Sequence, residues 1–118
     1  MAMHGTGGED GSLQGMLEML DLPYTSSNVL GSAVGQDKVI MKEILEYEHV
    51  PMVPWFFVYS NDITNTYKDI EAKAETIGYP LIIKPANLGS SIGIEIVHKK
   101  DELKSALSEC AKYDDKLV

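Results

Sequence analysis

Apolar residues recur every three or four positions in several stretches of the chain, which is the spacing of a helix with one buried face. This pattern predicts a helix after Ser12, one helical turn at 28–34, and helices over 37–48 and 66–77. A final helix is expected after Asp101. Its apolar spacing is the most regular: Leu103, Ala106, Leu107, Cys110 and Ala111. We expect these helices to pack their apolar faces against a common core.

Short apolar runs between the helices have the length and composition of strands. They lie at 55–59, 81–84 and 94–98, and the last six residues, YDDKLV, resemble the start of a further strand. From Asp37 onward the order is helix, strand, helix, strand, strand, helix, strand. This order has too many strands for a doubly wound sheet. It predicts an α+β fold, a two-layer sandwich with helices on one face of a small, mostly antiparallel sheet.

The composition limits the possible partners. The chain has 118 residues, of which 44% are hydrophobic, and this suffices for one modest core. Its formal charge is −8, and all ten of its Lys and Arg residues are lysines. We therefore expect no nucleic acid partner and no membrane partner. Any arginine clamp on a carboxylate or phosphate would have to come from outside these residues.

Neither a targeting segment nor a reactive cysteine is expected. No apolar run approaches the roughly 18 residues of a membrane span, and the first residues do not lead into the apolar region of a signal peptide. A cytoplasmic protein is the expectation. Cys110 is the only cysteine and falls on the apolar face of the last helix, which favours an inert buried thiol over a nucleophile.

The sequence KPANLGSSIGI, at 84–94, places a lysine at the end of a buried strand and then a loop of glycine and serine. Residues 89–93 match the G-x-S-x-G pattern of a hydrolase nucleophile elbow, with Ser91 as nucleophile. That motif needs a helix directly after the serine, then an acid and a histidine. Here a strand follows and His98 is the only later histidine, so we reject the elbow. The chain also has no G-x-x-x-x-G-K-[ST] phosphate-binding loop.

Two interpretations of this loop remain, an anion-binding flap and an ordinary hairpin loop. Two hydroxyls, two glycines that let backbone N–H groups point inward, and the ammonium of Lys84 form a set of donors able to close over a phosphate. Lys38 opens a helix and could face the same anion, although a lysine in that position is more often solvated. The residues alone leave both interpretations open.

Four longer stretches occur in a characteristic order: HGTGGEDGSLQGMLEMLDLPYTSS, GSAVGQDKVIMKEIL, YPLIIKPANLGSSIGI and YDDKLV. Together they resemble the D-alanine:D-alanine ligase family of ATP-grasp enzymes, and the resemblance covers nearly the entire chain. The combination of H-G-x-x-G-E-D-G, a D-K helix start and K-P-A-N-x-G-S-S-x-G is specific, although each alone would be weak. The resemblance implies that ATP phosphorylates one D-alanine and that a second D-alanine attacks the acylphosphate, giving a dipeptide for peptidoglycan.

The resemblance implies a phosphate site in this chain. Lys84 and Lys38 are similar to the two family lysines that hold ATP phosphates. Residues 89–93 are similar to the flap that closes over the triphosphate. The cradle would be completed by the backbone N–H groups of Ser91, Ile92 and Gly93.

Three further residues resemble catalytic positions of the family. Ser90 is similar to the serine that bonds a lid-loop tyrosine near the substrate. His4 and Glu9 are similar to residues of the first domain that border the D-alanine pocket. The residues alone also allow simpler roles, since Glu9 could cap the following helix and His4 could belong to a frayed terminus.

The resemblance also implies which parts are not in these residues. The ligands for two Mg²⁺ ions, the arginine that faces the acylphosphate and the glutamate that binds the first amine are expected outside this chain. Residues 1–35 would be a remnant of an α/β N-terminal domain, and residues 36–118 the first lobe of the ATP-grasp unit, truncated at its last strand. Because the family's active site lies between two lobes, we expect the segment alone to be inactive. The full-length form is expected to be a homodimer.

Alternative functions remain at this point. Within the same family, a D-alanine:D-lactate or D-alanine:D-serine ligase is the nearest alternative, because the loop that selects the second substrate lies outside these residues. From a different class, the chain could be a nucleotide-binding module without catalysis. A third possibility is a structural α+β domain whose loop has no ligand.

Overall fold

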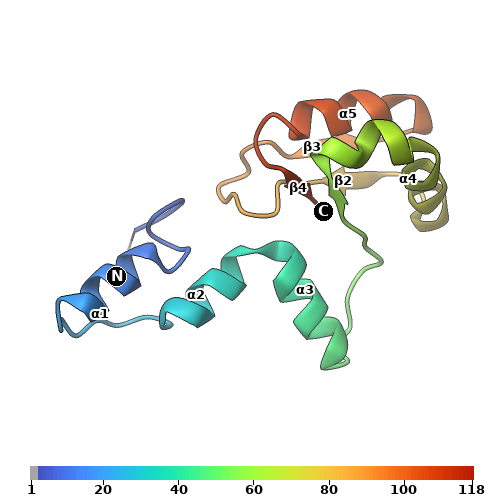
Figure 1. The fold of residues 1–118 in the computed structure, drawn as a ribbon. Coiled ribbons are helices and arrows are strands. Elements are labelled where there is room, and N and C mark those ends of the chain that lie inside the picture. The colour runs from blue at the N-terminus through green and yellow to red at the C-terminus, as the bar shows by residue number, and fades with distance from the viewer. Residues whose placement is uncertain (1–2) are drawn as a thin grey trace.

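The first part of the chain is helical. The computed structural model describes residues 3–118. Its first three helices are α1 (Ser12–Met19), α2 (Val29–Gln36) and α3 (Lys38–Tyr47) (Figure 1). The side chain of Asn28 accepts a hydrogen bond from the N–H of Gly31 at 2.9 Å and so caps α2. With this cap, α2 extends over 8 residues instead of the single turn expected from its small side chains.

Helix α3 begins where the sequence predicts, because Asp37 is its N-cap. The carboxylate of Asp37 accepts hydrogen bonds from the N–H groups of Val39 at 2.9 Å and Ile40 at 3.2 Å. These bonds satisfy two of the donors that a helix N-terminus leaves unpaired. The cap fixes the direction of the first turn, and therefore the position of Lys38, the first residue of the helix.

The second part of the chain alternates strands and helices. Its elements are β1 (Val58–Tyr59), η1 (Ser60–Asp62), α4 (Ile63–Ile77), β2 (Leu81–Ile83), β3 (Glu95–Val97), η2 (Lys100–Glu102), α5 (Leu103–Cys110) and β4 (Lys116–Leu117). From α3 onward this is the predicted order of helices and strands. The strand expected at 55–59 is shorter than predicted, since only its last two residues pair.

The strands form two antiparallel pairs that are joined by further backbone hydrogen bonds. β2 pairs with β3, and β1 pairs with β4. Directly after β2, Lys84 exchanges two hydrogen bonds with Val118, with N···O distances of 2.8 and 2.9 Å. The Ala86 N–H donates to the Lys116 carbonyl at 2.8 Å. The continuation of β2 therefore runs antiparallel to β4, and the two pairs act as one small sheet.

The core lies between this sheet and the helices α4 and α5, which Figure 1 shows together on one side of the strands. Its members are apolar residues with little or no exposed surface: Ile63, Ile70, Ala74, Ile83, Val97, Leu103, Ala106, Leu107, Cys110 and Leu117. All of them come from α4 onward or from the strands. The α+β prediction, with helices on one face of a small antiparallel sheet, is confirmed.

Helices α1 to α3 form an arm that extends away from this core (Figure 1). The described structure is elongated, with principal extents of 52 × 32 × 23 Å. In the arm, the side chains of Gln14 and Val39 are buried, whereas many apolar side chains, such as Met19 and Leu30, are exposed. Within residues 3–118, no helix has the length and hydrophobicity needed to cross a membrane.

We expect Leu103→Ala to lower the free energy of unfolding by about 2–5 kcal/mol, because it removes a side chain that is 1% exposed and leaves a cavity between α5 and the sheet. Chemical denaturation followed by circular dichroism measures this loss. The same substitution at Leu30, which is 71% exposed, serves as the control. Equal losses in the two variants would contradict the placement of the core.

Candidate active site

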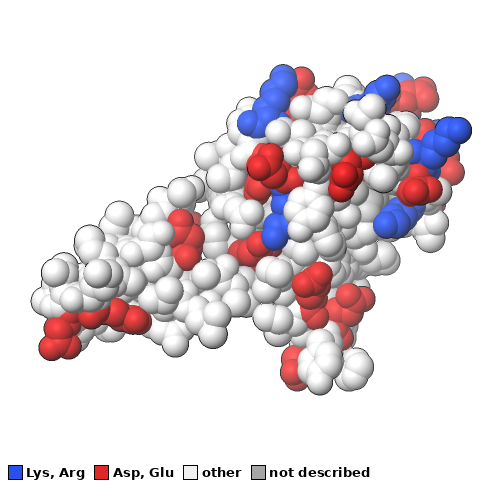
Figure 2. Space-filling view, in the orientation of Figure 1, with Lys and Arg blue, Asp and Glu red and all other residues white. Residues whose placement is uncertain are grey.

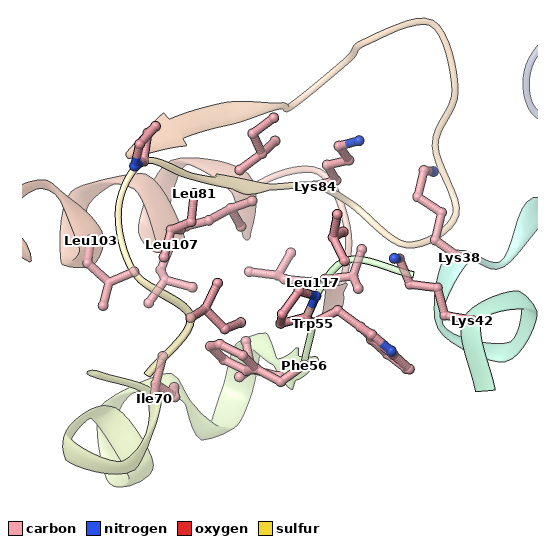
Figure 3. Close-up of a pocket in the computed structure, with 18 of the residues that line it drawn as sticks. Lys38, Lys42, Trp55, Phe56, Ile70, Leu81, Lys84, Leu103, Leu107 and Leu117 are labelled. Carbon is pink, nitrogen blue, oxygen red and sulfur yellow. The ribbon is translucent and has the colours of Figure 1, made fainter. Parts of the chain in front are cut away.

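A cavity of about 580 Å³ lies beside the sheet, where the start of α3 approaches the end of β2. Most of its wall is apolar and includes Trp55 and Phe56, as Figure 3 shows. The side chains of Lys38 and Lys84 lie at one end of the cavity. Lys42, from the next turn of α3, holds its ammonium 5.5 Å from the centre of the Trp55 ring. The cavity thus has mostly apolar walls and positively charged side chains at one end.

Lys38 is held against the residues that follow β2. Its backbone N–H donates to the carbonyl of Ala86 at 3.0 Å, and its ammonium donates to the same carbonyl at 3.2 Å and to the carbonyl of Leu88. Burial and, after it, the positive charge of Lys84 lower the pKa of Lys38. The nearby carboxylates of Asp114, Asp37 and Glu9 act in the opposite direction.

Lys84 follows β2, far from Lys38 in the sequence, but its side chain lies at the same end of the cavity. Its backbone is fixed by the two hydrogen bonds with Val118, and its side chain is half-buried. Lys84 and Lys38 both line this cavity, and Figure 3 shows their side chains at the same end of it. The two lysines therefore place two positive charges at one end of the cavity, in a chain whose formal charge is −8.

The glycine- and serine-rich loop, residues 85–94, reaches from the sheet toward the N-terminal arm (Figure 1). We call it the flap. Ser90 and Ser91 are both exposed and both have left-handed backbone conformations, with φ of 52° and 61°. The N–H of Ile92 donates to the carbonyl of Gly89 at 3.2 Å and closes a turn. The donors expected to cradle a phosphate therefore lie on one tight turn, and that of Ile92 already has a partner within the flap.

His4 and Glu9 lie next to each other, and Glu9 lies close to the flap. A carboxylate oxygen of Glu9 accepts from the N–H of Gly5 at 2.7 Å, and His4 Nδ1 lies 3.5 Å from the other oxygen. A Cβ atom built on Gly89 would lie 3.4 Å from Glu9 Oε2, so the two segments are close together. Glu9 does not cap α1, because its carboxylate accepts from the N–H of Gly5 and the N-cap of that helix is Gly11, which makes no side-chain hydrogen bond.

The contacts that hold the site together involve residues that the sequence analysis did not select. Asp37 and Lys116, 79 residues apart, form a half-buried ion pair between the cap of α3 and β4. The side-chain amide of Gln36 donates to the carbonyl of Asn87 at 2.8 Å. Asp114 accepts from the N–H of Asn87 at 2.7 Å. Only the cap at Asp37 had a signal in the sequence, namely its place before an amphipathic run.

Acidic side chains and lysines are distributed differently over the molecule. Figure 2 shows acidic side chains along the whole molecule, whereas lysines appear only over the part formed by the later residues. The sequence has no lysine before Lys38. Among residues 3–118, no group of three or more histidine, cysteine, aspartate or glutamate side chains is arranged to hold a metal ion.

We expect Lys116→Gln to lower the free energy of unfolding by about 1–3 kcal/mol at neutral pH, because it leaves the half-buried Asp37 carboxylate without its cation. Burial raises the pKa of Asp37, but the hydrogen bond from Lys116 and those from backbone N–H groups outweigh it, and the net pKa is below 3.8. The contribution is therefore present above pH 3.8 and is lost as the pH falls through the lower folded pKa.

Denaturation curves recorded over a range of pH test this expectation. The control is Lys112→Gln, which removes an exposed partner of Glu109 with the same change of side chain and should have a much smaller effect. The free energies of unfolding of wild type and Lys116→Gln should become more similar in acid. If their difference does not decrease, the ion pair does not stabilise the contact between α3 and β4.

Comparison with known proteins identifies the family. A family model described as "D-ala D-ala ligase C-terminus" matches residues 44–118. The D-alanine:D-alanine ligase of Thermoanaerobacter sp. (strain X514) is 48% identical over 116 residues, which are 98% of this chain and 32% of that protein. The ligase of Thermosipho africanus is 42% identical over 122 residues, covering 100% of this chain and 32% of its own length. The chain thus spans about a third of these relatives.

Solved structures of such ligases share the fold. The enzyme from Coxiella burnetii is 38% identical with a TM-score of 0.82, over 97% of this chain and 34% of that chain. The Bacillus anthracis ligase in complex with ATP is 37% identical with a TM-score of 0.81, over 98% and 37%. The VanG D-Ala:D-Ser ligase of Enterococcus faecalis is 32% identical with a TM-score of 0.85, over 97% and 32%. The chain belongs to the D-alanine:D-alanine ligase family.

Proposed function

We propose that this chain is the part of an ATP-dependent D-alanine:D-alanine ligase that holds the nucleotide phosphates. One observation carries the proposal. Lys38 and Lys84, from segments far apart in the sequence, meet at one end of an apolar cavity, beside a flap of glycine and serine. The similarity of the chain to a ligase solved in complex with ATP supports ATP as the ligand of this arrangement.

The two lysines would bind the phosphates as localised positive charges. An ammonium group has three N–H donors. The bonds from Lys38 to the carbonyls of Ala86 and Leu88 use two of them. The third can then point to a phosphate oxygen. Lys84 directly follows β2 and is held by its backbone hydrogen bonds with Val118, and it supplies the second charge. Such fixed charges favour the transition state in which negative charge spreads over the moving phosphoryl group.

The flap and the cavity wall would complete the nucleotide site. The backbone N–H groups of Ser91, Ile92 and Gly93 are the donors we assign to the phosphates. Since the N–H of Ile92 donates to Gly89 at 3.2 Å, that turn has to open slightly, or share its donor, when the nucleotide binds. The apolar wall with Trp55 suits the flat face of a nucleobase.

The reaction we assign to the whole enzyme is the joining of two D-alanines. A carboxylate oxygen of the first D-alanine attacks the γ-phosphorus, ADP leaves, and an acylphosphate forms. The amine of the second D-alanine then attacks the acyl carbon and loses a proton. Phosphate leaves with the bridging oxygen, which came from the carboxylate, and the dipeptide is formed. We assign His4, Glu9 and Ser90 to the border of the D-alanine pocket, which the closeness of Glu9 to the flap supports.

The remaining assignments concern the whole protein. We propose that it is a cytoplasmic homodimer that serves peptidoglycan synthesis and uses Mg²⁺. The metal does not fit residues 3–118, which offer no cluster of ligands for it, so we derive no step through it from this chain. We further propose residues 1–35 as part of the N-terminal domain and residues 36–118 as part of the first lobe of the ATP-grasp unit.

A second candidate keeps the same chemistry but changes the second substrate. The VanG D-Ala:D-Ser ligase has a TM-score of 0.85 with this chain, a value as high as those of the D-alanine:D-alanine ligases. The fold therefore accommodates both, and ligase assays with D-alanine, D-serine and D-lactate as second substrate separate them.

We expect the 118-residue chain alone to form no dipeptide and to bind ATP weakly or not at all, because one lobe supplies half of the contacts of an ATP-grasp site and none of the metal ligands. A coupled assay for ADP release with ATP, Mg²⁺ and D-alanine, together with isothermal titration with ATP, measures both. Dipeptide formation above that of a heat-denatured sample would overturn this expectation.

Turnover is testable in a chimera in which this chain replaces the matching 116 residues of the Thermoanaerobacter ligase. There, we expect Lys84→Ala to lower kcat/KM for ATP by about 100-fold to 1000-fold, because it removes the positive charge that faces the phosphates. The melting temperature should change little. The matched control is Lys68→Ala at an exposed position of α4. If Lys84→Ala leaves turnover unchanged, a structural role for the loop is the better interpretation.

A further inference from the structure

Both ends of the flap rest on one short segment, Tyr113 and Asp114, which connects α5 to β4. At the first end, the Asp114 carboxylate accepts from the N–H of Asn87 at 2.7 Å and from its side-chain amide at 3.2 Å, across 27 residues of sequence. The other carboxylate oxygen accepts from the N–H of Lys116 at 3.1 Å. Both oxygens of Asp114 are therefore engaged, and its side chain is fixed between the flap and β4.

At the second end, Gly93 packs against the ring of Tyr113. A Cβ atom built on Gly93 would lie 2.8 Å from Cδ2 of Tyr113 and 2.8 Å from Cγ of Pro85. Those distances are shorter than a carbon contact permits, so the backbone at Gly93 lies directly on the two rings. Its φ of +70° adds a second reason for glycine. Pro85, Gly93 and Tyr113 thus form a contact that closes the flap at its base.

The two ends of the flap are held by contacts with Asp114 and Tyr113, whereas its tip is exposed. The carbonyl of Asn87 also accepts from Gln36 at 2.8 Å, and that of Leu88 accepts from the ammonium of Lys38. In contrast, Ser90, Ser91 and Ile92 are all exposed. A loop built in this way keeps the spacing between its two ends while its tip moves over a ligand.

A carboxylate at this position is unfavourable for binding an anion. Asp114 accepts from the N–H of Asn87, and the carbonyls on either side of that residue, of Ala86 and Leu88, accept from the Lys38 ammonium. Its negative charge therefore lies near the cationic end of the cavity. A negative charge there weakens the attraction for phosphate. Its presence requires another role, and the hydrogen bonds to Asn87 and Lys116 supply one.

We propose that Asp114 and Tyr113 are positioning residues for ATP: they hold the two ends of the flap so that its N–H groups and Lys84 face the phosphates together. This inference rests on the proposed function, because it takes the flap to be the lid over the triphosphate. Neither residue touches the nucleotide. Each acts through a flap residue, Asp114 through Asn87 and Tyr113 through Gly93. Holding donors in place before binding reduces the loss of conformational entropy when the ligand arrives.

The first test is hydrogen–deuterium exchange on the 118-residue chain with Asp114→Asn. Asparagine offers one oxygen in place of two, so one N–H group, of Asn87 or of Lys116, then faces another donor. We expect the hydrogen-bonded amides of the flap, those of Asn87 and Ile92, to exchange about threefold to tenfold faster, with exchange in α5 and β2 unchanged. Asp115→Asn is the control, because it makes the same change of charge at the residue next to Asp114, which bonds the flap. Unchanged exchange in the flap would overturn the inference.

The second test is the Michaelis constant for ATP in the chimera with the Thermoanaerobacter ligase. Asp114→Asn removes a negative charge near the phosphates, and a purely electrostatic role would lower KM for ATP. A positioning role predicts the opposite, an increase of about threefold to tenfold, with KM for D-alanine changed much less. A lowered or unchanged KM would overturn the inference.

Tyr113→Ala gives an independent measure without a change of charge, at a side chain that is 52% exposed and therefore tolerant of substitution. We expect faster exchange at 92–94 and a raised KM for ATP, and normal values of both would count against the inference. Lys84→Ala in the same chimera separates the two proposals. If it removes turnover while Asp114→Asn changes neither exchange nor KM, the inference fails and the proposed function stands. If it has no effect on turnover, the proposed function fails.

Discussion

The first turn of α3 is hydrogen-bonded to the strand end at Ala86, and the relative placement of arm, sheet and flap depends on this contact. The Ala86 carbonyl accepts from both the backbone N–H and the ammonium of Lys38, at 3.0 and 3.2 Å. Beside it, the ion pair of Asp37 with Lys116 ties the cap of α3 to β4. The main core contains no residue of α1 to α3. These polar bonds therefore attach the arm to the sheet, whereas apolar burial holds the elements of the core together.

The same contact links stability to the proposed chemistry. Lys38 is placed by its bonds to the base of the flap, so the residue assigned to the phosphates also organises the loop that would close over them. Burial and the neighbouring Lys84 lower the pKa of Lys38, and the nearby carboxylates of Asp114, Asp37 and Glu9 offset part of this effect. An acidic chain can bind an anion in this way because attraction depends on the nearest charges, and distant ones are screened by salt.

Much of the fold was predictable from the sequence. Helical spacing after Asp101 and the strand runs at 81–84 and 94–98 identify elements that the structure contains, since periodic burial is a local property. Sequence reasoning did less well at 55–59, where an apolar run that reads as a strand pairs over two residues only. The length of a strand depends on a partner, and the partner here is β4, far along the chain.

The sequence by itself determined the family, the α+β order and the residues to consider: Lys38, Lys84, the flap, His4 and Glu9. These follow from motifs and spacing, and the roles of the individual residues stay predictions. Only the tertiary structure decided which groups meet. The bonds of Asn87 to Asp114 and of Asp37 to Lys116 join residues 27 and 79 positions apart. No local pattern marks such partners, because a carboxylate finds its donor through the packing of the whole chain and not through its neighbours in sequence.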